Sequence, residues 1–209
     1  MVFVEGMNEM TDQQYGNQSR HYLHRPPDAA GTPLHFESLS GTAERSTPSI
    51  VNKAKLDLVV LQYMARRVNM ALTLHYQAAD AAGPLLYYAK ERRKRTHRIA
   101  IYQPDELFQN TDIAFVGFIS GKRLSTSPAV IDELHAIDTK MIVELMNTPG
   151  ILSYSSLELR DGNWCNLVLL SDLDAKIHVK NSDTHKYAAY DLAPHYYEWI
   201  RLHLSLIHI

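Results

Sequence analysis

The residues of this sequence that could do chemistry are a histidine and several aromatic and amide side chains in its carboxyl-terminal half. His185 lies in a polar stretch typical of a helix, and an imidazole that titrates near neutral pH can act as a general base. Trp164, Asn166, Tyr187 and Trp199 supply rings and hydrogen-bonding groups that suit ligand binding. We therefore take His185 as the candidate catalytic residue and the other four as candidate substrate-binding residues.

Other kinds of site lack their motifs. The chain contains no HExxH, EF-hand, P-loop, GxGxxG or GxSxG pattern. Cys165 is the single cysteine, which excludes an internal disulfide and a cysteine-based zinc site. His178 and His185 would share one helical face if no break lay between them, but a mononuclear metal normally needs a third ligand. We predict neither a metal nor a cofactor.

Composition narrows the class of protein. The 209 residues are 45% apolar and 21% charged, as in soluble globular proteins, and no apolar run is long enough for a membrane-spanning helix. The amino end lacks a secretion signal, so we expect a cytoplasmic protein. A formal charge of −2 makes nucleic acid an unexpected partner for the whole chain. Residues 90 to 98 nevertheless carry six Lys or Arg residues, which leaves polyanion binding open.

The amino-terminal half divides into an arm and a helical segment. Residues 1 to 46 are rich in Gly, Pro and polar residues, which predicts a flexible arm. We interpret residues 47 to 110 as a helical segment whose long helix begins at Thr47-Pro48 and ends before Gly83-Pro84. The basic run then reads as a solvated helix end that precedes a strand. The expected apolar face of the long helix follows Leu58, Leu61, Ala65, Val68, Leu72 and His75, widened by Val60, Met64 and Ala71.

The carboxyl-terminal half has a regular order of elements. Residues 113 to 119 form an apolar run, and Ser127-Pro128 begins a helix whose apolar residues recur every three or four positions. Asp161-Gly162 joins two strand-like runs into a predicted hairpin. A polar helix, broken near Asn181-Ser182, precedes a last aromatic-rich strand. The order strand, helix, strand, strand, helix, strand predicts an α+β, ferredoxin-like βαββαβ domain over residues 111 to 203.

This order, with Pro149-Gly150 before a strand, Asp161-Gly162 before Trp164, and His185 in the second helix, resembles the dimeric α/β-barrel superfamily. The resemblance covers about residues 112 to 203 and is nearest to domains like the antibiotic-biosynthesis monooxygenases. It implies a homodimer with a cavity for a small apolar or aromatic molecule between sheet and helices. Cofactor-independent oxygenases occur in the superfamily, but a complete catalytic set of Asn, Trp and His cannot be matched here.

Residues 204 to 209, Leu-Ser-Leu-Ile-His-Ile, look like the translation of a sequencing adapter. We therefore expect a non-native tail, and we expect the natural chain to continue differently after His203.

Three functional hypotheses remain open at this point. The first is a small-molecule-binding domain, with cofactor-independent oxygenation or isomerisation as its possible reaction. The second is a non-catalytic oligomerisation or interaction module, which the long helix favours, and the third is polyanion binding through residues 90 to 98. A four-stranded sheet with helices on one side leaves its other face bare. We expect a partner subunit or the helix of residues 48 to 80 to cover that face.

Overall fold

The computed structural model describes residues 36–38, 48–77, 83–110 and 112–208. A seven-stranded sheet lies at the centre, with strand order β1-β7-β4-β6-β5-β3-β2. Of the predicted arm, residues 1–35 and 39–46 lie outside the described residues. The strands are β1 (Phe36–Ser38), β2 (Leu85–Lys90), β3 (Thr96–Ile101), β4 (Asp112–Lys122), β5 (Ile151–Glu158), β6 (Trp164–Leu170) and β7 (Tyr197–His208).

Four of these strands form the predicted ferredoxin-like unit. Strands β7, β4, β6 and β5 lie side by side and pair antiparallel, with a helical connection after β4 and another after β6. This is the split βαβ arrangement, so the fold prediction is confirmed. The helices are α3 (Pro128–Met146), α4 (Lys176–Asn181), α5 (Asp183–Lys186), the π-helical turn η4 (Tyr187–Leu192) and α6 (Ala193–Tyr196).

The starts and turns of this unit follow their sequence signals. Ser127 accepts a hydrogen bond from the Val130 amide, and Pro128 occupies the first turn of α3. Strands β5 and β6 form the predicted hairpin around a short 3-10 turn, η3 (Arg160–Gly162), in which Gly162 has φ +74°. The break predicted near Asn181-Ser182 separates α4 from α5.

The basic run does not lie at a helix end, contrary to our interpretation. Helix α1 (Pro48–Gln77) ends before this region, and β2 and β3 form an antiparallel hairpin whose turn is η2 (Arg92–Lys94). Alternating burial in β3, with His97, Ile99 and Ile101 on one face, explains why this segment joins the sheet. The β2–β3 hairpin extends the sheet beyond β5, and β1 extends it on the other side by parallel pairing with β7.

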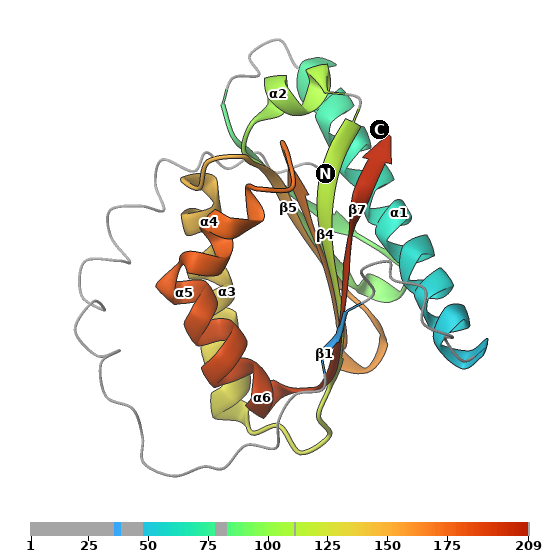
Figure 1. Ribbon diagram of the computed structural model, residues 1–209, viewed down its shortest axis with the longest axis vertical. Coiled ribbons are helices and arrows are strands. Elements are labelled where there is room, and N and C mark those ends of the chain that lie inside the picture. Colours follow the sequence, from blue (N-terminus) through green and yellow to red (C-terminus); the bar gives the residue numbers. More distant parts are fainter. Residues whose placement is uncertain (1–35, 39–47, 78–82, 111, 209) are drawn as a thin grey trace.

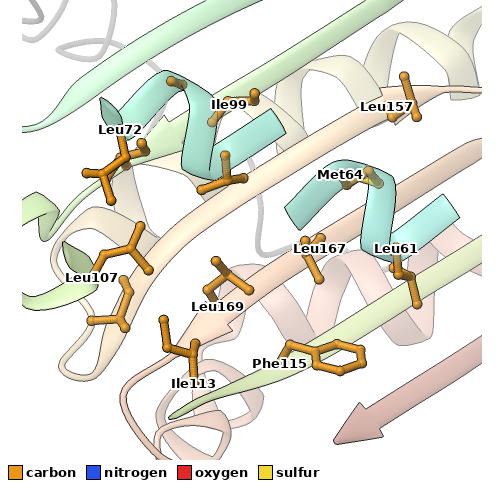
Figure 2. Close-up of a cluster of buried hydrophobic side chains, with 14 of the residues drawn as sticks. Leu61, Met64, Leu72, Ile99, Leu107, Ile113, Phe115, Leu157, Leu167 and Leu169 are labelled. Atoms are coloured by element: carbon orange, nitrogen blue, oxygen red, sulfur yellow. The ribbon is translucent and has the colours of Figure 1, made fainter. Parts of the chain in front are cut away.

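Helices cover both faces of the sheet. Helices α3 to α6 lie on one face and α1 crosses the other, as Figure 1 shows. The α1 face holds the larger apolar cluster, in which Leu61, Met64 and Leu72 pack on residues of β3 to β6 (Figure 2). Gly117 permits this close approach, because a Cβ atom there would lie 2.5 Å from Leu61. Of the two covers that the sequence allowed, α1 is the one observed.

The helical face carries two smaller apolar clusters. One gathers Ile142 and Leu145 of α3 with β3, β5 and β6 residues, and the other joins Tyr196 and Tyr197 to Ile200. Strand β7 continues through residues 204 to 208, which pair with β4. This pairing does not test the expected origin of residues 204 to 209. Among the described residues, no helix is long and apolar enough to cross a membrane.

Candidate functional site

A row of side chains crosses the helical face of the sheet from β2 to β4. The strand register aligns Tyr88, Arg98, Ser156, Asn166 and Phe118 as successive neighbours on five adjacent strands. Three consecutive members of the row, Arg98, Ser156 and Asn166, are polar in a sheet that is otherwise largely apolar. Such a row under a helix layer can hydrogen-bond a molecule held between sheet and helices.

Asp138 reaches down to this row from α3. Its Oδ2 accepts a hydrogen bond from Nη2 of Arg98, and its Oδ1 accepts one from the Tyr154 hydroxyl at 2.9 Å. Burial, reinforced by the nearby Asp138, raises the pKa of Tyr154 well above its usual value, so this phenol stays neutral and donates. The Arg98 guanidinium also lies 5.8 Å from the centre of the Tyr154 ring.

Several buried polar atoms near this row have no hydrogen-bond partner in the structure. Nε of Arg98, Oδ1 of Asn166 and the Tyr102 hydroxyl are in this state. Burial raises the pKa of Tyr102, which therefore remains a neutral phenol. A buried polar atom without a partner costs about 1–3 kcal/mol, so each of these atoms has a reason to bind water or a ligand.

The row borders a small pocket. Its volume is about 60 Å³, and its walls are Tyr88, Thr96, Arg98, Asp138, Ser156 and Trp164. The pocket therefore combines two aromatic side chains with an ion pair and the hydroxyl groups of Thr96 and Ser156. It is much smaller than the roughly 300–1,000 Å³ of a typical ligand site. It can hold a few water molecules or a fragment of similar size.

The β2–β3 hairpin places positive charge beside the mouth of this pocket. Tyr88, Thr96 and Arg98 come from the strands of the hairpin, and Lys90 pairs with Thr96 across it. The basic side chains of its turn form no ion pair with an acidic residue of the described chain: Arg92, Arg93, Lys94 and Arg95. Arg93 and Lys94 have positive φ values of 64° and 60°. Such values are unfavourable for residues other than Gly, Asn or Asp.

The structure brings together two of the five predicted site residues. Trp164 and Asn166 point to the helical face, because Cys165, Leu167 and Leu169 between and after them pack toward α1. Trp164 lines the pocket, and Asn166 belongs to the polar row beside it. The sequence predicted a shared face for these two residues, and the packing of α1 now identifies that face as the one beneath the helices.

Trp199 lies on the opposite face of the sheet. Its indole packs against the apolar cluster beneath α1, and the Arg201 guanidinium stacks on it at 4.0 Å. Trp164 and Trp199 therefore cannot line one pocket.

His185 and Tyr187 connect the second helical layer to α3. The Tyr187 hydroxyl donates to Glu133, while the half-buried His185 ring lies in the field of Glu144. Burial lowers the pKa of His185, although Glu144 opposes this effect, and its Nδ1 is buried without a partner. Neither side chain lines the pocket beneath Trp164. A larger open depression of about 470 Å³ runs along α3, and it has no aromatic lining: Lys140, Val143, Glu144, Asn147 and Thr148.

The α1 face carries two buried charged clusters of its own. In the first, Asp57 of α1 accepts two hydrogen bonds from Arg201, at 2.6 and 2.7 Å, and lies 3.0 Å from Nε2 of His203. Burial alone would raise the pKa of Asp57, but Arg201 and His203 together hold it below its usual value. The carboxylate is therefore charged and fully paired, and it fixes the amino-terminal half of α1 to β7.

The second cluster centres on His97, whose side chain is completely buried. Its Nδ1 lies 3.0 Å from Oε1 of Glu91 and its Nε2 lies 2.8 Å from the Ser155 hydroxyl. Arg67 and Tyr63 of α1 also donate to Glu91. Burial lowers the pKa of His97 despite Glu91, so the ring is neutral. A serine, a histidine and a carboxylate in line resemble a catalytic triad, but Ser155 is 0% exposed beneath α1. This cluster therefore fixes α1 rather than meeting a substrate.

The main polar residues of both faces were not predicted. Asp138 and Asp57 each lie next to a residue of the apolar stripe of a helix, and Arg98 lies beside the apolar residues 99 to 101 of β3. A charged residue beside an apolar stripe was the signal in the sequence that could have indicated these sites, because a buried charge needs a partner.

Within the described residues, no group of three His, Cys, Asp or Glu side chains could hold a metal ion. Burial raises the pKa of Cys165, so that buried thiol is a packed side chain and not a nucleophile.

Proteins similar to this chain are found among solved structures. No protein-family model matches the chain, and no curated protein matches it. Among solved structures, protein SO0527 from Shewanella oneidensis is 17% identical, with 46% of this chain and 92% of that chain covered and a TM-score of 0.35. A dimeric ferredoxin-like protein of unknown function from Jannaschia sp. CCS1 is 12% identical, covering 46% and 99%, with a TM-score of 0.37.

A third similar structure is SnoaB, a cofactor-independent oxygenase from Streptomyces nogalater. It is 16% identical, with 48% of this chain and 94% of that chain covered and a TM-score of 0.35. The ferredoxin-like assignment itself stands on the strand order.

Proposed function

We propose that the chain is a small-molecule-binding protein whose site is the pocket between the sheet and α3, at Arg98, Asp138 and Trp164. The observation that carries the proposal is a pocket with an aromatic wall and an ion pair, next to buried polar atoms that lack partners. Apolar walls with a few convergent polar groups are typical of ligand sites. The volume of about 60 Å³ requires a small ligand, or a shift of α3 that opens the pocket.

The two tryptophans provide a direct test, because they lie on opposite faces of the sheet. Protein labelled with ¹⁵N has two indole signals, and Trp164→Phe assigns them. Small fragments of diverse chemistry, each added at millimolar concentration, should include some that shift the Trp164 signal and leave Trp199 unchanged. If no fragment moves Trp164 selectively, the proposed site is wrong.

A reaction at this site is a finer proposal. Cofactor-independent oxygenases and isomerases, which the sequence resemblance implies, both benefit from a base that accepts a proton from the substrate. Asp138 is the carboxylate that lines the pocket, and Arg98 could stabilise the anion formed. With any fragment that binds and carries an acidic C–H bond, Asp138→Asn should abolish deuterium exchange from solvent while Trp164 still shifts. Unchanged exchange in this variant would exclude Asp138 as the base.

An oligomerisation module is the second candidate, and the outer side of α1 favours it. Its large apolar side chains recur at three- to seven-residue spacing and are 41–67% exposed: Leu56, Val59, Tyr63, Met70 and Leu74. A stripe of this kind suits pairing with the same helix of a second copy. Sedimentation over a wide concentration range should show a dimer that Val59→Glu dissociates. Leu124→Glu, at a fully exposed leucine outside the helices, should leave the dimer intact. A concentration-independent monomer would contradict this candidate.

A further inference from the structure

We infer that the pocket selects small anionic molecules, and that the β2–β3 hairpin attracts them; this inference rests on the proposed function. It follows from the charges around the pocket, from the unpaired atoms beside it and from its size.

The unpaired atoms define the groups that a ligand needs. Nε of Arg98 is a buried donor, and it is available because Asp138 uses only Nη2 of the same guanidinium. Oδ1 of Asn166, two positions along the row, is also unpaired but does not line the pocket. A carboxylate oxygen of a ligand can accept from Nε of Arg98. Guanidinium groups favour carboxylates in particular, because planar geometry and charge both match.

The balance of charge around the mouth favours an anion. Arg98 and Asp138 neutralise each other, so the remaining groups decide the local field. Glu158 contributes one negative charge next to Trp164. Against it stand five hairpin cations that form no ion pair within the described chain: Lys90, Arg92, Arg93, Lys94 and Arg95. A patch of one sign raises the local concentration of ligands of the opposite sign, and salt weakens the effect.

The unfavourable turn conformation agrees with a role for these cations. Arg93 and Lys94 occupy positions where Asn or Gly would be favoured, at φ 64° and 60°. The hairpin thus presents charged side chains at a conformational cost. The pocket volume of about 60 Å³ limits the buried part of the ligand to roughly four or five non-hydrogen atoms, at about one water-sized probe volume each.

Three two-carbon probes of similar shape and different charge test the inference. Glycolate is anionic, ethylene glycol is neutral and ethanolamine is cationic, and each carries a hydroxyl group. The shift of the Trp164 indole signal gives the dissociation constant, and the Trp199 signal on the other face is the internal control. We expect glycolate to bind at least about tenfold more tightly than ethylene glycol, with ethanolamine weakest. Dissociation constants of small fragments are commonly about millimolar.

Variants separate the pocket from the hairpin. Replacing Arg92, Arg93 and Lys94 together with Gln should weaken glycolate binding several-fold at low ionic strength and have little effect at high salt. Arg66→Gln, which removes a single charge at an exposed position of α1, is the control and should change nothing. Arg98→Lys keeps the charge but removes the planar donor pair, so it should weaken glycolate more than ethylene glycol.

The outcomes distinguish this inference from the proposed function. If ethylene glycol binds as tightly as glycolate, selection for an anion is wrong and the pocket stands. If the triple variant behaves like the parent at low salt, the hairpin has no part in binding. If none of the three probes shifts Trp164 while neutral library fragments do, the inference fails alone. If no compound shifts Trp164, the proposed function fails as well.

Discussion

The two faces of the sheet differ in whether their buried polar groups have hydrogen-bond partners. On the α1 face, Asp57 and His97 each have partners for their hydrogen-bonding atoms, and both clusters attach α1 to the sheet. On the helical face, Arg98 and Asn166 lie beside a pocket and keep atoms without partners. Four of the five buried unpaired side-chain atoms of the described residues are in this second layer, the exception being Ser153 beneath α1.

This difference separates groups that stabilise the fold from groups available for binding. A buried polar atom with a partner contributes to stability, whereas one without a partner reduces stability unless a ligand or water supplies the bond. Residue types alone would have suggested that the α1 face holds the functional site, because the Ser155, His97 and Glu91 cluster resembles a catalytic site. The comparison gives four predictions, ordered by the size of the expected effect.

The largest effect should come from Asp57. Asp57→Ala leaves Arg201 buried without its carboxylate, which typically costs about 3–5 kcal/mol of unfolding free energy. Urea denaturation measures the loss, and Leu56→Ala, at the exposed neighbour, is the control and should cost little. Exchanging both Asp57 and Arg201 for apolar residues should recover part of the loss. A loss below about 1 kcal/mol in the single variant would contradict the structural role of this cluster.

Acid should reduce stability through the buried histidines. Burial holds the pKa of His97 and of His185 below the ordinary value of 6.5. As pH falls below 6.5 the unfolded chain gains protons that the folded chain does not, so unfolding free energy falls, by up to about 1.4 kcal/mol per pH unit for each group. The loss ends once the pH drops below the folded pKa values.

Denaturation series from pH 7 to pH 5 measure this slope. His97→Gln should flatten it, whereas His195→Gln, at an exposed position, should leave it unchanged. A parent protein whose stability is the same at pH 5 and pH 7 would show that these rings are not held neutral.

A matched pair of substitutions compares the two faces directly. Ser155→Ala removes the hydroxyl bonded to His97 and leaves Nε2 without a partner, which should cost about 1–3 kcal/mol. Asn166→Leu removes an amide oxygen that has no partner, so it should be nearly neutral. Thermal unfolding of both variants measures the two losses of stability. Equal losses would mean that the two faces do not differ in the way described.

The smallest effect concerns the hairpin turn. Replacing Arg93 and Lys94 with Asn and Gly fits the positive φ values, and we expect a gain of about 1 kcal/mol. The same change removes two cations near the pocket mouth, so stability should rise while binding of anions weakens. A loss of stability would show that the turn residues form contacts which outweigh the unfavourable backbone conformation.

Much of the fold was accessible from the sequence because periodicity is a local signal. Ser127-Pro128 and Asp161-Gly162 marked a helix start and a hairpin through their own backbone preferences. The β2–β3 hairpin was missed, because its turn is made of arginine and lysine instead of the usual turn residues. The long helix was expected to bury Leu58, but this side chain is 40% exposed, whereas Met64 and Ala71, which were expected to widen the same face, are 0% and 2% exposed.

The site was less accessible because its members meet only through the sheet. Arg98 and Asp138 lie forty residues apart in the sequence, and their contact depends on β3 pairing with β5 beneath α3. Trp164 and Asn166 were predicted from the hairpin, but their face became clear only when α1 was seen to cover the other one. His185 was selected for its titration, a property of the residue type that does not reveal its position between helices.

The placement of the strands at the two sides of the sheet has a consequence for synthesis on the ribosome. Strand β3 pairs with β5, and β1 pairs with residues 200 to 202 of β7, so the first strands to emerge wait for partners made much later. During that interval α1 exposes both its buried stripe and its outer apolar stripe to other chains. Vectorial folding therefore leaves the amino-terminal half vulnerable to aggregation until translation of β7 is complete, and chaperone binding should concentrate on α1 in that period.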